Sequence, residues 1–313
     1  LSCVSGAKDL KMSSILKNRT YKIKERATGT ACYLCGNGNY KQKDGYVRDN
    51  ARLKVLECCN CGLVFLSSFD HVGKDFYENS GMHGESPRNF HELLNEAVLD
   101  DERRFEFIKP LLINCSVLDF GCGTGGFLNR VKSLTRVAHG IELEKRFAKY
   151  YQQMDMQVYA NISSVPDGNC YDIITLFHVL EHLPDPKATL IQLSRFLKEN
   201  GKIIIEVPNL DDALLTLYQC KDFQSFTYWS CHLYLFNPST LSKLAEQAGL
   251  KINYIKHVQR YSLANHLYWL CQGKPGGHQH WPFFNTPELH RAYEAQLAAL
   301  GKCDTLMMSL SFC

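Results

Sequence analysis

The sequence predicts an α/β protein with a doubly wound, mostly parallel sheet. A glycine-rich turn follows a short apolar run within residues 117–128, and strand-like and helix-like segments alternate from about residue 116 to 258. Residues 171–177 form a near-continuous apolar run, which is typical of a strand buried on both faces. Ligands of such sheets bind at the carboxyl ends of the strands, so function is expected there.

The glycine-rich turn follows the first predicted strand. Gly121, Gly123 and Gly125 let backbone N–H groups approach a ligand, and the helix predicted at 126–134 offers partial positive charge to a carboxylate or phosphate. The turn also fits the dinucleotide pattern Gly-x-Gly-x-x-Gly. Asp119, two residues earlier, favours a cationic ligand over a pyrophosphate. A purely structural turn is the alternative.

The second and third strands are predicted at 137–142 and 157–160. Glu142 ends the second strand, about 20 residues past the glycines, where a carboxylate can accept both hydroxyls of a ribose. Glu144 is a less favoured substitute for it. Either acid could instead only stabilise the N-terminus of the helix predicted at 145–153.

The fourth predicted strand, 171–177, leads directly into His178, Glu181 and His182 before two prolines interrupt regular structure. These three side chains are therefore expected at the carboxyl end of a buried strand. The next predicted elements are a helix at 187–198 that Gly201 ends, a fifth strand at 202–209 and a helix at 209–219. A further helix begins at a cap, Asn237 or Ser239, and ends at Gly249. The last elements are a strand at 252–258, a helix at 287–300 and a strand at 304–312.

Two segments exceed a minimal sheet domain. Aromatic residues crowd around His232 within 223–236, after the fifth strand, where they would form a wall of the substrate site. An insertion precedes the last strand; it carries a glycine-rich loop in which Lys274 could meet an anion such as a diphosphate. His278 and His280 invite a metal interpretation, but no third ligand is evident beside them.

Two Cys-x-x-Cys pairs near the N-terminus predict a structural zinc site. Cys32 and Cys35 form the first pair, Cys58 and Cys61 the second, and such pairs place four thiolates around one tetrahedral ion. Cys59 is a competing ligand that would break the spacing. Reduced cysteines without a metal are the alternative.

Composition bounds the partners and the location. The formal net charge of +3 over 313 residues argues against wholesale binding of a nucleic-acid backbone. No stretch reaches 18 apolar residues, so no membrane partner is expected. Fourteen cysteines, most without a repeated spacing, suggest reduced thiols and a cytoplasmic location. The start of the chain lacks the apolar core of a signal peptide. Oligomeric state is left open.

Residues 87–112 carry apolar side chains at helical intervals, which predicts one or two helices that pack on the sheet and cap its ligand site. The expected organisation is an N-terminal tail at 1–29, a zinc-binding module at 30–72, a linker with capping helices at 73–115, and a catalytic domain at 116–313 with substrate-binding insertions at 220–236 and 260–302.

The turn resembles the first motif of class I S-adenosylmethionine-dependent methyltransferases, which reads much like Val-Leu-Asp-x-Gly-Cys-Gly-Thr-Gly. The resemblance implies a Rossmann-like sheet and S-adenosylmethionine as cofactor, with its carboxylate on the glycine loop, its ammonium near Asp119, directly or through water, and its ribose on Glu142. The cofactor-binding residues it implies are Asp119, Gly121, Cys122, Gly123, Thr124, Gly125, Glu142, Asn161, Phe177 and His178.

A four-cysteine module followed by such a domain, with the segment His-Leu-Tyr-Leu-Phe-Asn-Pro-Ser-Thr-Leu at 232–241, resembles deoxysugar C-methyltransferases and surface-polysaccharide methyltransferases. The C-methylating branch has Tyr-x-Glu-His where this chain has Trp229, Cys231 and His232. Only the histidine is retained, and O-methyl transfer needs only one base to take a hydroxyl proton. Both O- and C-methylation remain open.

Three histidines are candidate bases, since histidine titrates near neutral pH. His178 is preferred because it ends the fourth strand, His232 comes next from the aromatic segment, and His182 could instead be structural. The sequence thus predicts methylation of a small-molecule acceptor, a sugar or nucleotide-sugar, in surface-polysaccharide or natural-product biosynthesis. The alternatives are an RNA methyltransferase that grips RNA with its zinc ribbon and a non-catalytic cofactor-binding protein.

Overall fold

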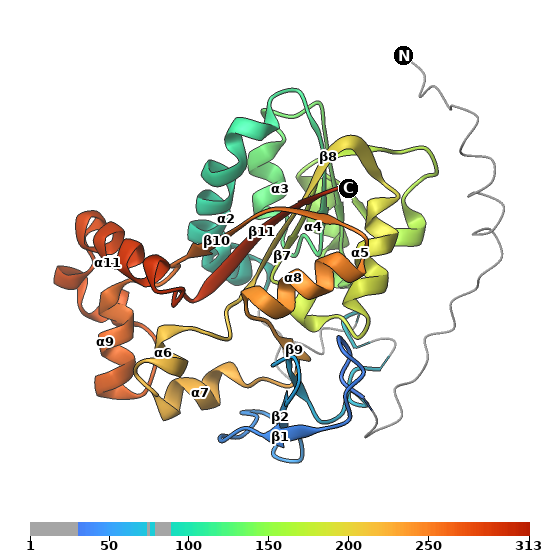
Figure 1. Cartoon of the computed structure of the whole chain (residues 1–313). Helices are drawn as coiled ribbons and strands as arrows, with labels where there is room; N and C mark the ends of the chain where they lie inside the picture. Colours follow the sequence, from blue (N-terminus) through green and yellow to red (C-terminus); the bar gives the residue numbers. More distant parts are fainter. Residues whose placement is uncertain (1–30, 74–75, 79–88) are drawn as a thin grey trace. The chain divides into compact units, whose positions relative to one another are not determined.

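The computed structural model describes residues 31–73, 76–78 and 89–313 (Figure 1). The tail predicted at 1–29 and part of the predicted linker lie outside the described residues. Among the described residues, no helix combines the length and the apolar character that crossing a membrane requires.

A seven-stranded sheet forms the centre of the catalytic part, in the order β10-β11-β8-β7-β4-β5-β6. Its strands are β4 (Ser116–Phe120), β5 (Val137–Ile141), β6 (Gln157–Tyr159), β7 (Tyr171–Phe177), β8 (Leu197–Pro208), β10 (Lys251–Val258) and β11 (Thr305–Ser311). β4 to β8 pair in parallel, and β11 lies antiparallel between β8 and β10. The predicted Rossmann-like sheet is confirmed. Its order reverses at β4, which opens a crevice between the loops after β4 and β7.

Helices cover both faces of this sheet. α2 (Phe90–Leu112), α3 (Gly126–Val131) and α4 (Ala148–Gln153) pack on one face, and α5 (Pro186–Ser194) and α8 (Pro238–Gln247) on the other (Figure 1). The alternation of strand side chains explains the two layers: in β8, Ile203 and Ile205 join the core under α5 and α8, whereas Ile204 joins the core under α2 and α3. Short 3₁₀ turns follow several strands, at η2 (Lys145–Phe147), η3 (Ile162–Ser164) and η4 (Leu180–His182).

Local sequence fixes the start of two of these helices. The Asn89 side chain accepts from the Glu92 backbone N–H, and the Glu92 side chain accepts from the Asn89 N–H, a capping box that starts α2. Asn237 and Thr240 form the corresponding box at α8, so the cap is Asn237 rather than Ser239. The region predicted as one or two helices is a single helix with Pro110 in its last turn.

Two predicted helix boundaries are wrong. The helix predicted at 187–198 ends at Ser194, and Gly201 lies inside β8 rather than ending a helix. β8 begins early because Leu197 pairs with Tyr171, and a register shift takes up the extra residues. A Cβ at Gly201 would lie 2.7 Å from Leu197 Cδ1, so glycine is needed there for close approach.

The region after β8 also differs from the prediction. Of the helix predicted at 209–219, only α6 (Ala213–Thr216) forms, because the backbone of Asn209 pairs with Phe236 as a β-bridge and its N–H donates to the Asp304 carbonyl at 2.8 Å, which keeps this residue extended. Part of the predicted aromatic loop is instead a helix, α7 (Lys221–Thr227).

The cysteine-containing region forms a second, antiparallel sheet of β1 (Tyr40–Gln42), β2 (Val55–Cys58), β3 (Val64–Leu66) and β9 (Tyr234–Leu235). β9 comes from the segment that carries His232, so the two regions share a sheet and a continuous core. The predicted C-terminal insertion is confirmed: between β10 and β11 lie α9 (Leu263–Gln272), α10 (Gly277–His280), η5 (Pro282–Phe284) and α11 (Pro287–Ala299).

Candidate active site

The glycine loop after β4 has the backbone that its sequence requires. Gly121, Gly123 and Gly125 have φ of 75°, 53° and 76°, which L side chains rarely adopt. A Cβ at Gly121 would lie 2.4 Å from Val179 Cγ2, so this loop packs directly on the segment after β7. A Cβ at Gly123 would meet nothing within 4 Å, so the centre of the loop faces open space. The loop can therefore cradle a ligand with backbone N–H groups.

Asp119 lies at the carboxyl end of β4 and is almost fully buried. Its neighbour across the strands is Thr175 in β7, whose hydroxyl donates to Asp119 Oδ1 at 2.6 Å. Burial raises the pKa of Asp119 to about 7. A cationic group placed beside this carboxyl would favour its ionised form, which suits the predicted contact with an ammonium.

Glu142 follows β5 and faces the glycine loop. Its Oε2 accepts from the Gly123 N–H at 2.8 Å, and its Oε1 accepts from the Glu144 N–H at 2.9 Å. Burial raises the pKa of Glu142. Carboxylate oxygens have lone pairs left for ribose hydroxyls, so Glu142 can both shape the loop and bind a sugar ring.

The other predicted cofactor residues lie around this crevice. Cys122 and Thr124 are buried within the loop itself. The Phe177 ring meets Phe127 of α3 edge to face, with ring centroids 4.9 Å apart. Asn161 is exposed after β6 and accepts from the Ser164 hydroxyl at 3.0 Å.

A buried ionic cluster lies between α2 and β8. Glu206 in β8 has no exposed surface and receives four N–H bonds of 2.8–3.0 Å from Arg103 and Arg104. Although burial acts in the other direction, the charge of Arg104 helps to hold the pKa of Glu206 well below its usual range. Arg103 also pairs with Asp100 at 3.0 Å, and Asp100 in turn binds Arg260. The cluster ties α2, β8 and the chain after β10 together.

His178 lies inside this cluster, at φ 54° just after β7. Its Nδ1 is 3.2 Å from Glu181 Oε1, and its Nε2 is 3.2 Å from Glu206 Oε1 and 3.0 Å from Arg260 Nη1. Burial and Arg260 act to lower the pKa of His178, but its hydrogen bonds to the two carboxylates outweigh them, so the pKa is raised. The close contact with Arg260 opposes protonation of Nε2, because two donors cannot bond each other. In either protonation state, both nitrogens face partners.

His182 and His232 form a pair beside it, with ring centroids 5.1 Å apart. His182 Nδ1 is 2.8 Å from the Cys231 carbonyl, and His232 Nδ1 is 3.2 Å from the Thr227 carbonyl. A carbonyl only accepts, so Nδ1 carries the proton in each ring and Nε2 keeps its lone pair. Burial lowers the pKa of His182, and burial together with His182 lowers the pKa of His232 to about 3. Both rings are therefore neutral at pH 7.

The cysteine-containing region positions the segment that carries His232. Asp49 accepts from the Ser230 N–H at 3.0 Å and from its hydroxyl at 2.6 Å. The Arg48 guanidinium lies over the rings of Phe226 and Trp229, at 4.7 and 4.6 Å. The backbone of Leu66 in β3 donates to Leu233. These contacts lie on both sides of His232.

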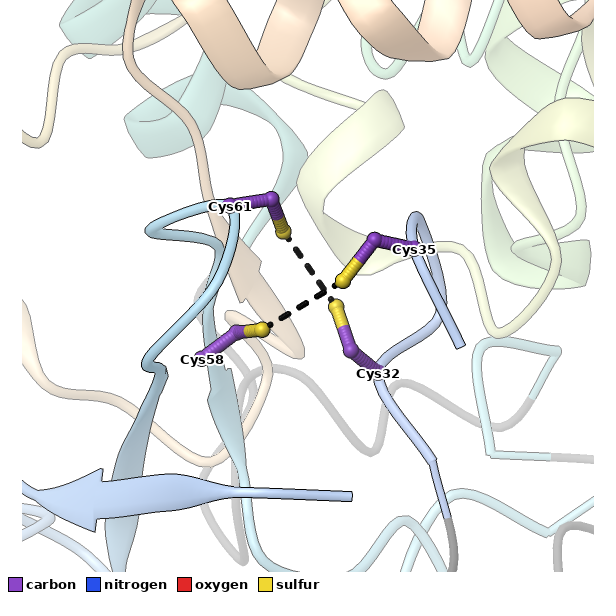
Figure 2. Close-up of side chains that lie close together, drawn as sticks. All are labelled: Cys32, Cys35, Cys58 and Cys61. Atoms are coloured by element: carbon purple, nitrogen blue, oxygen red, sulfur yellow. Dashed lines mark hydrogen bonds between the residues drawn. The ribbon is translucent and has the colours of Figure 1, made fainter. Parts of the chain in front are cut away.

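The four predicted zinc ligands converge. Figure 2 shows the sulfur atoms of Cys32, Cys35, Cys58 and Cys61 pointing toward one another from two turns. The Cys32–Cys61 and Cys35–Cys58 sulfur pairs are 3.4 and 3.5 Å apart, and all four lie within 4.8 Å of one another. Sulfurs at about 2.3 Å from a tetrahedral ion would be about 3.8 Å apart. The cluster fits one zinc ion, whereas Cys59 is exposed.

Sequence reasoning missed the ionic cluster. Glu206 interrupts the apolar run of β8, and a carboxylate within a strand that is buried on both faces was a signal that a cation lies against it. The partners could not be identified locally, because Arg103 is 103 residues away and Arg260 lies beyond another strand. His278 and His280, the other metal candidates, both lie in α10, and His280 is exposed.

The chain matches known proteins over the part that contains this site. Residues 79–255 match the model of a family described as "Methyltransferase domain". A protein of Methanocaldococcus jannaschii described as uncharacterized is 34% identical over 160 residues, 49% of this chain and 68% of that protein. A ubiquinone biosynthesis O-methyltransferase of Hydrogenovibrio crunogenus is 26% identical over 226 residues, 64% of this chain and 88% of that protein.

Solved structures match as well. A SAM-dependent methyltransferase from Archaeoglobus fulgidus shares 21% identity and a TM-score of 0.46, over 71% of this chain and 99% of that chain. Magnesium protoporphyrin IX methyltransferase from Synechocystis with bound SAH shares 12% identity and a TM-score of 0.45, over 79% of this chain and all of that chain.

Proposed function

The chain belongs to the family of methyltransferase domains and is an S-adenosylmethionine-dependent methyltransferase; on that premise we propose that it methylates a hydroxyl oxygen of a small-molecule acceptor, a sugar or nucleotide-sugar. The observation that carries the proposal is the neutral pair of His182 and His232, whose Nε2 lone pairs are free of hydrogen bonds to the described residues. His182 lies on the segment after β7 that packs against Gly121 through Val179. When bound, the cofactor supplies an electrophilic methyl group on a positively charged sulfur.

The residues around the crevice have distinct roles in this proposal. The backbone of the glycine loop binds the carboxylate of the cofactor, Asp119 favours its ammonium, and Glu142 accepts from its ribose. His182 and His232 act on the acceptor hydroxyl, whereas His178 positions Glu181 and does not face the acceptor. The sequence favoured His178 as the base. Because both nitrogens of His178 face charged neighbours, we prefer His182 and His232 for this role.

Three observations support a sugar or nucleotide-sugar as the acceptor and oxygen as the methylated atom. The cysteine-containing region and the aromatic segment at 223–236 resemble those of sugar methyltransferases. The Trp229 ring lies beside the two imidazoles, with its centroid 6.0 Å from that of His182 and 5.3 Å from that of His232. Oxygen as the target agrees with the names of the related ubiquinone biosynthesis O-methyltransferases. The arginines of the site are bound to Asp100 and Glu206, which leaves little basic surface for an RNA backbone.

The direct test incubates the protein with labelled cofactor and a nucleotide-sugar library and reads methylated products by mass spectrometry. We expect one compound class to gain a methyl group on oxygen. Label on carbon would contradict O-transfer, and label on RNA in a parallel reaction would contradict the acceptor class.

The substitution His232→Gln is expected to lower turnover by about 10²–10⁴-fold, the range for loss of a group that assists proton transfer. Cofactor affinity should change less than about twofold, because His232 lies on the acceptor side. Steady-state kinetics and calorimetry measure the two effects. The exposed His280→Gln is the matched control and should behave as wild type. Full turnover in His232→Gln would rule out a role for this imidazole.

Cofactor affinity is expected to rise with pH between about 5.5 and 7, by up to about tenfold per unit. Burial raises the pKa of Asp119 to about 7, so the free protein is protonated there at lower pH and must release a proton to meet an ammonium. The same raised pKa means that the stability of the free protein falls as pH rises from about 4 to about 7 and levels off above that, because the unfolded chain gives up this proton near pH 4 and the folded chain near pH 7.

The substitution Asp119→Asn tests both effects at once. It should weaken cofactor binding most at pH 7 and above, approach wild type as pH falls, and flatten the pH dependence of affinity and of urea stability. A variant that keeps the wild-type pH dependence of affinity would show that another group titrates.

A further inference from the structure

We propose that Glu181, His182 and His232 form a divalent metal site that holds the acceptor hydroxyl next to the methyl donor. One ligand atom from each of these three side chains lies within 4.8 Å of the other two. The catalytic part of this inference rests on the proposed methyl transfer to a hydroxyl and deepens it: with the ion bound, the two imidazoles assist proton loss through the metal instead of taking the proton themselves. The metal binding does not rest on the proposed function. The site is separate from the four-cysteine cluster.

The two imidazoles are oriented as metal ligands are. Each donates its Nδ1–H to a backbone carbonyl, of Cys231 in one case and of Thr227 in the other. Metal-ligating histidines almost always donate their second nitrogen to a carbonyl or carboxylate, which fixes the tautomer and the ring direction. His182 Nε2, which keeps its lone pair, lies 3.8 Å from Glu181 Oε1.

Glu181 contributes an oxygen that has no other use. The carboxylate is fully buried, and its Oε2 meets no hydrogen-bond donor among the described residues. Its Oε1 is 3.2 Å from His178 Nδ1, which holds the side chain in place. A buried carboxylate oxygen without a partner costs free energy, and a metal ion would satisfy it. Proton transfer between a base and an acceptor would not require this oxygen.

The distances between the three ligand atoms must shorten for them to bind one metal ion. Bonds of about 2.0–2.2 Å to nitrogen and oxygen place neighbouring ligand atoms about 3–3.5 Å apart. The three ligand atoms lie within 4.8 Å of one another, so each separation exceeds this range by less than about 2 Å, which side-chain rotations can close. Two imidazoles and one carboxylate with open positions are the ligand set of catalytic zinc and of related transition metals. We therefore assign the site to zinc or a similar divalent ion.

The location fits an acceptor-activating role. Val179, three residues before His182, would be 2.4 Å from a Cβ at Gly121, so the site adjoins the cofactor loop. The Tyr77 hydroxyl donates to the His182 carbonyl at 2.9 Å and packs the segment from the other side. A cation here lowers the pKa of a bound hydroxyl. The hydroxyl releases its proton to a solvent water, its oxygen bonds to the methyl carbon, and the C–S bond breaks with its electron pair left on a neutral sulfur.

The test counts metal ions on the full chain, without acceptor or cofactor. The protein is dialysed against a weak chelator that leaves the four-cysteine zinc in place, and Zn²⁺ is then titrated by calorimetry with metal content measured by mass spectrometry. Wild type should bind one further equivalent. Glu181→Gln and His232→Gln should lose it and keep the four-cysteine zinc, and His280→Gln should keep both ions.

Methyl transfer is measured separately with the dialysed protein and after Zn²⁺ is restored. Activity that falls at least tenfold on dialysis and returns with Zn²⁺ supports the catalytic role. A wild-type protein that binds zinc only at the four cysteines overturns the inference, even if methyl transfer persists. A second ion retained by both Glu181→Gln and His232→Gln also overturns it. Absence of methyl transfer with intact second-site binding would instead contradict the proposed function.

Discussion

Replacement of Glu206 by Gln is expected to destabilise the protein by about 3–5 kcal/mol, the range for removal of one partner from a buried ion pair. The substitution keeps the shape of the side chain and removes its charge. Arg103 and Arg104 are then left beside a neutral amide, with Asp100 and Asp101 as their remaining anionic partners. Both guanidinium groups are largely buried, so water cannot compensate for the lost charge.

Urea unfolding at pH 7 measures this loss. Glu206 has a depressed pKa, so its contribution is present above its ordinary pKa and is lost as pH falls; wild type and variant should converge in acid. The matched control is Glu106→Gln in α2, which removes an exposed pair with Lys109 and should cost less than about 1 kcal/mol. A Glu206→Gln protein as stable as this control would show that the buried cluster does not stabilise the fold.

Loss of the four-cysteine metal should abolish most methyl transfer without abolishing cofactor binding. In Cys58→Ser we expect one equivalent of zinc fewer and a turnover reduced by about 100-fold or more, the effect of displacing an acting group by about 1 Å. The four-cysteine cluster is connected to His232 through β3, which pairs with β9 next to His232, and through the hydrogen bond from the Ser230 hydroxyl to Asp49. The glycine loop is not part of this chain of contacts, so cofactor binding should persist.

The neighbouring Cys59 provides the control for that experiment. Cys59 is exposed and Cys58 is buried in the cluster, so Cys59→Ser changes the same atom type one residue away. It should retain zinc and activity. Zinc content and steady-state turnover are measured for both variants. A zinc-depleted Cys58→Ser protein with wild-type turnover would contradict the positioning role of this region.

The sheet and the glycine loop after β4 were predictable because their signals are local. The run from Asp119 to Gly125 encodes a strand, a tight turn and a helix start within a few residues, and the apolar stretch of β7 encodes double-sided burial. The two Cys-x-x-Cys pairs likewise encode one site by spacing alone. Each of these predictions depended on neighbours in sequence.

The misplaced elements depend on contacts between distant residues. Leu197 joins the sheet because Tyr171 offers it a partner, and this tertiary pairing overrides the expectation that Gly201 ends a helix. The environment of His178 is set by Glu206 and Arg260, 28 and 82 residues away. No periodicity relates these positions, so the sequence suggested His178 as a base without showing that its nitrogens face charged partners.

If the loop after β4 binds S-adenosylmethionine, calorimetric titration of this cofactor into the protein shows it most directly. We predict one molecule bound per chain, displaced by S-adenosylhomocysteine and not by a nicotinamide dinucleotide. A flat titration with the methyl donor, or saturable heat from the dinucleotide in its place, would show that this loop does not bind S-adenosylmethionine.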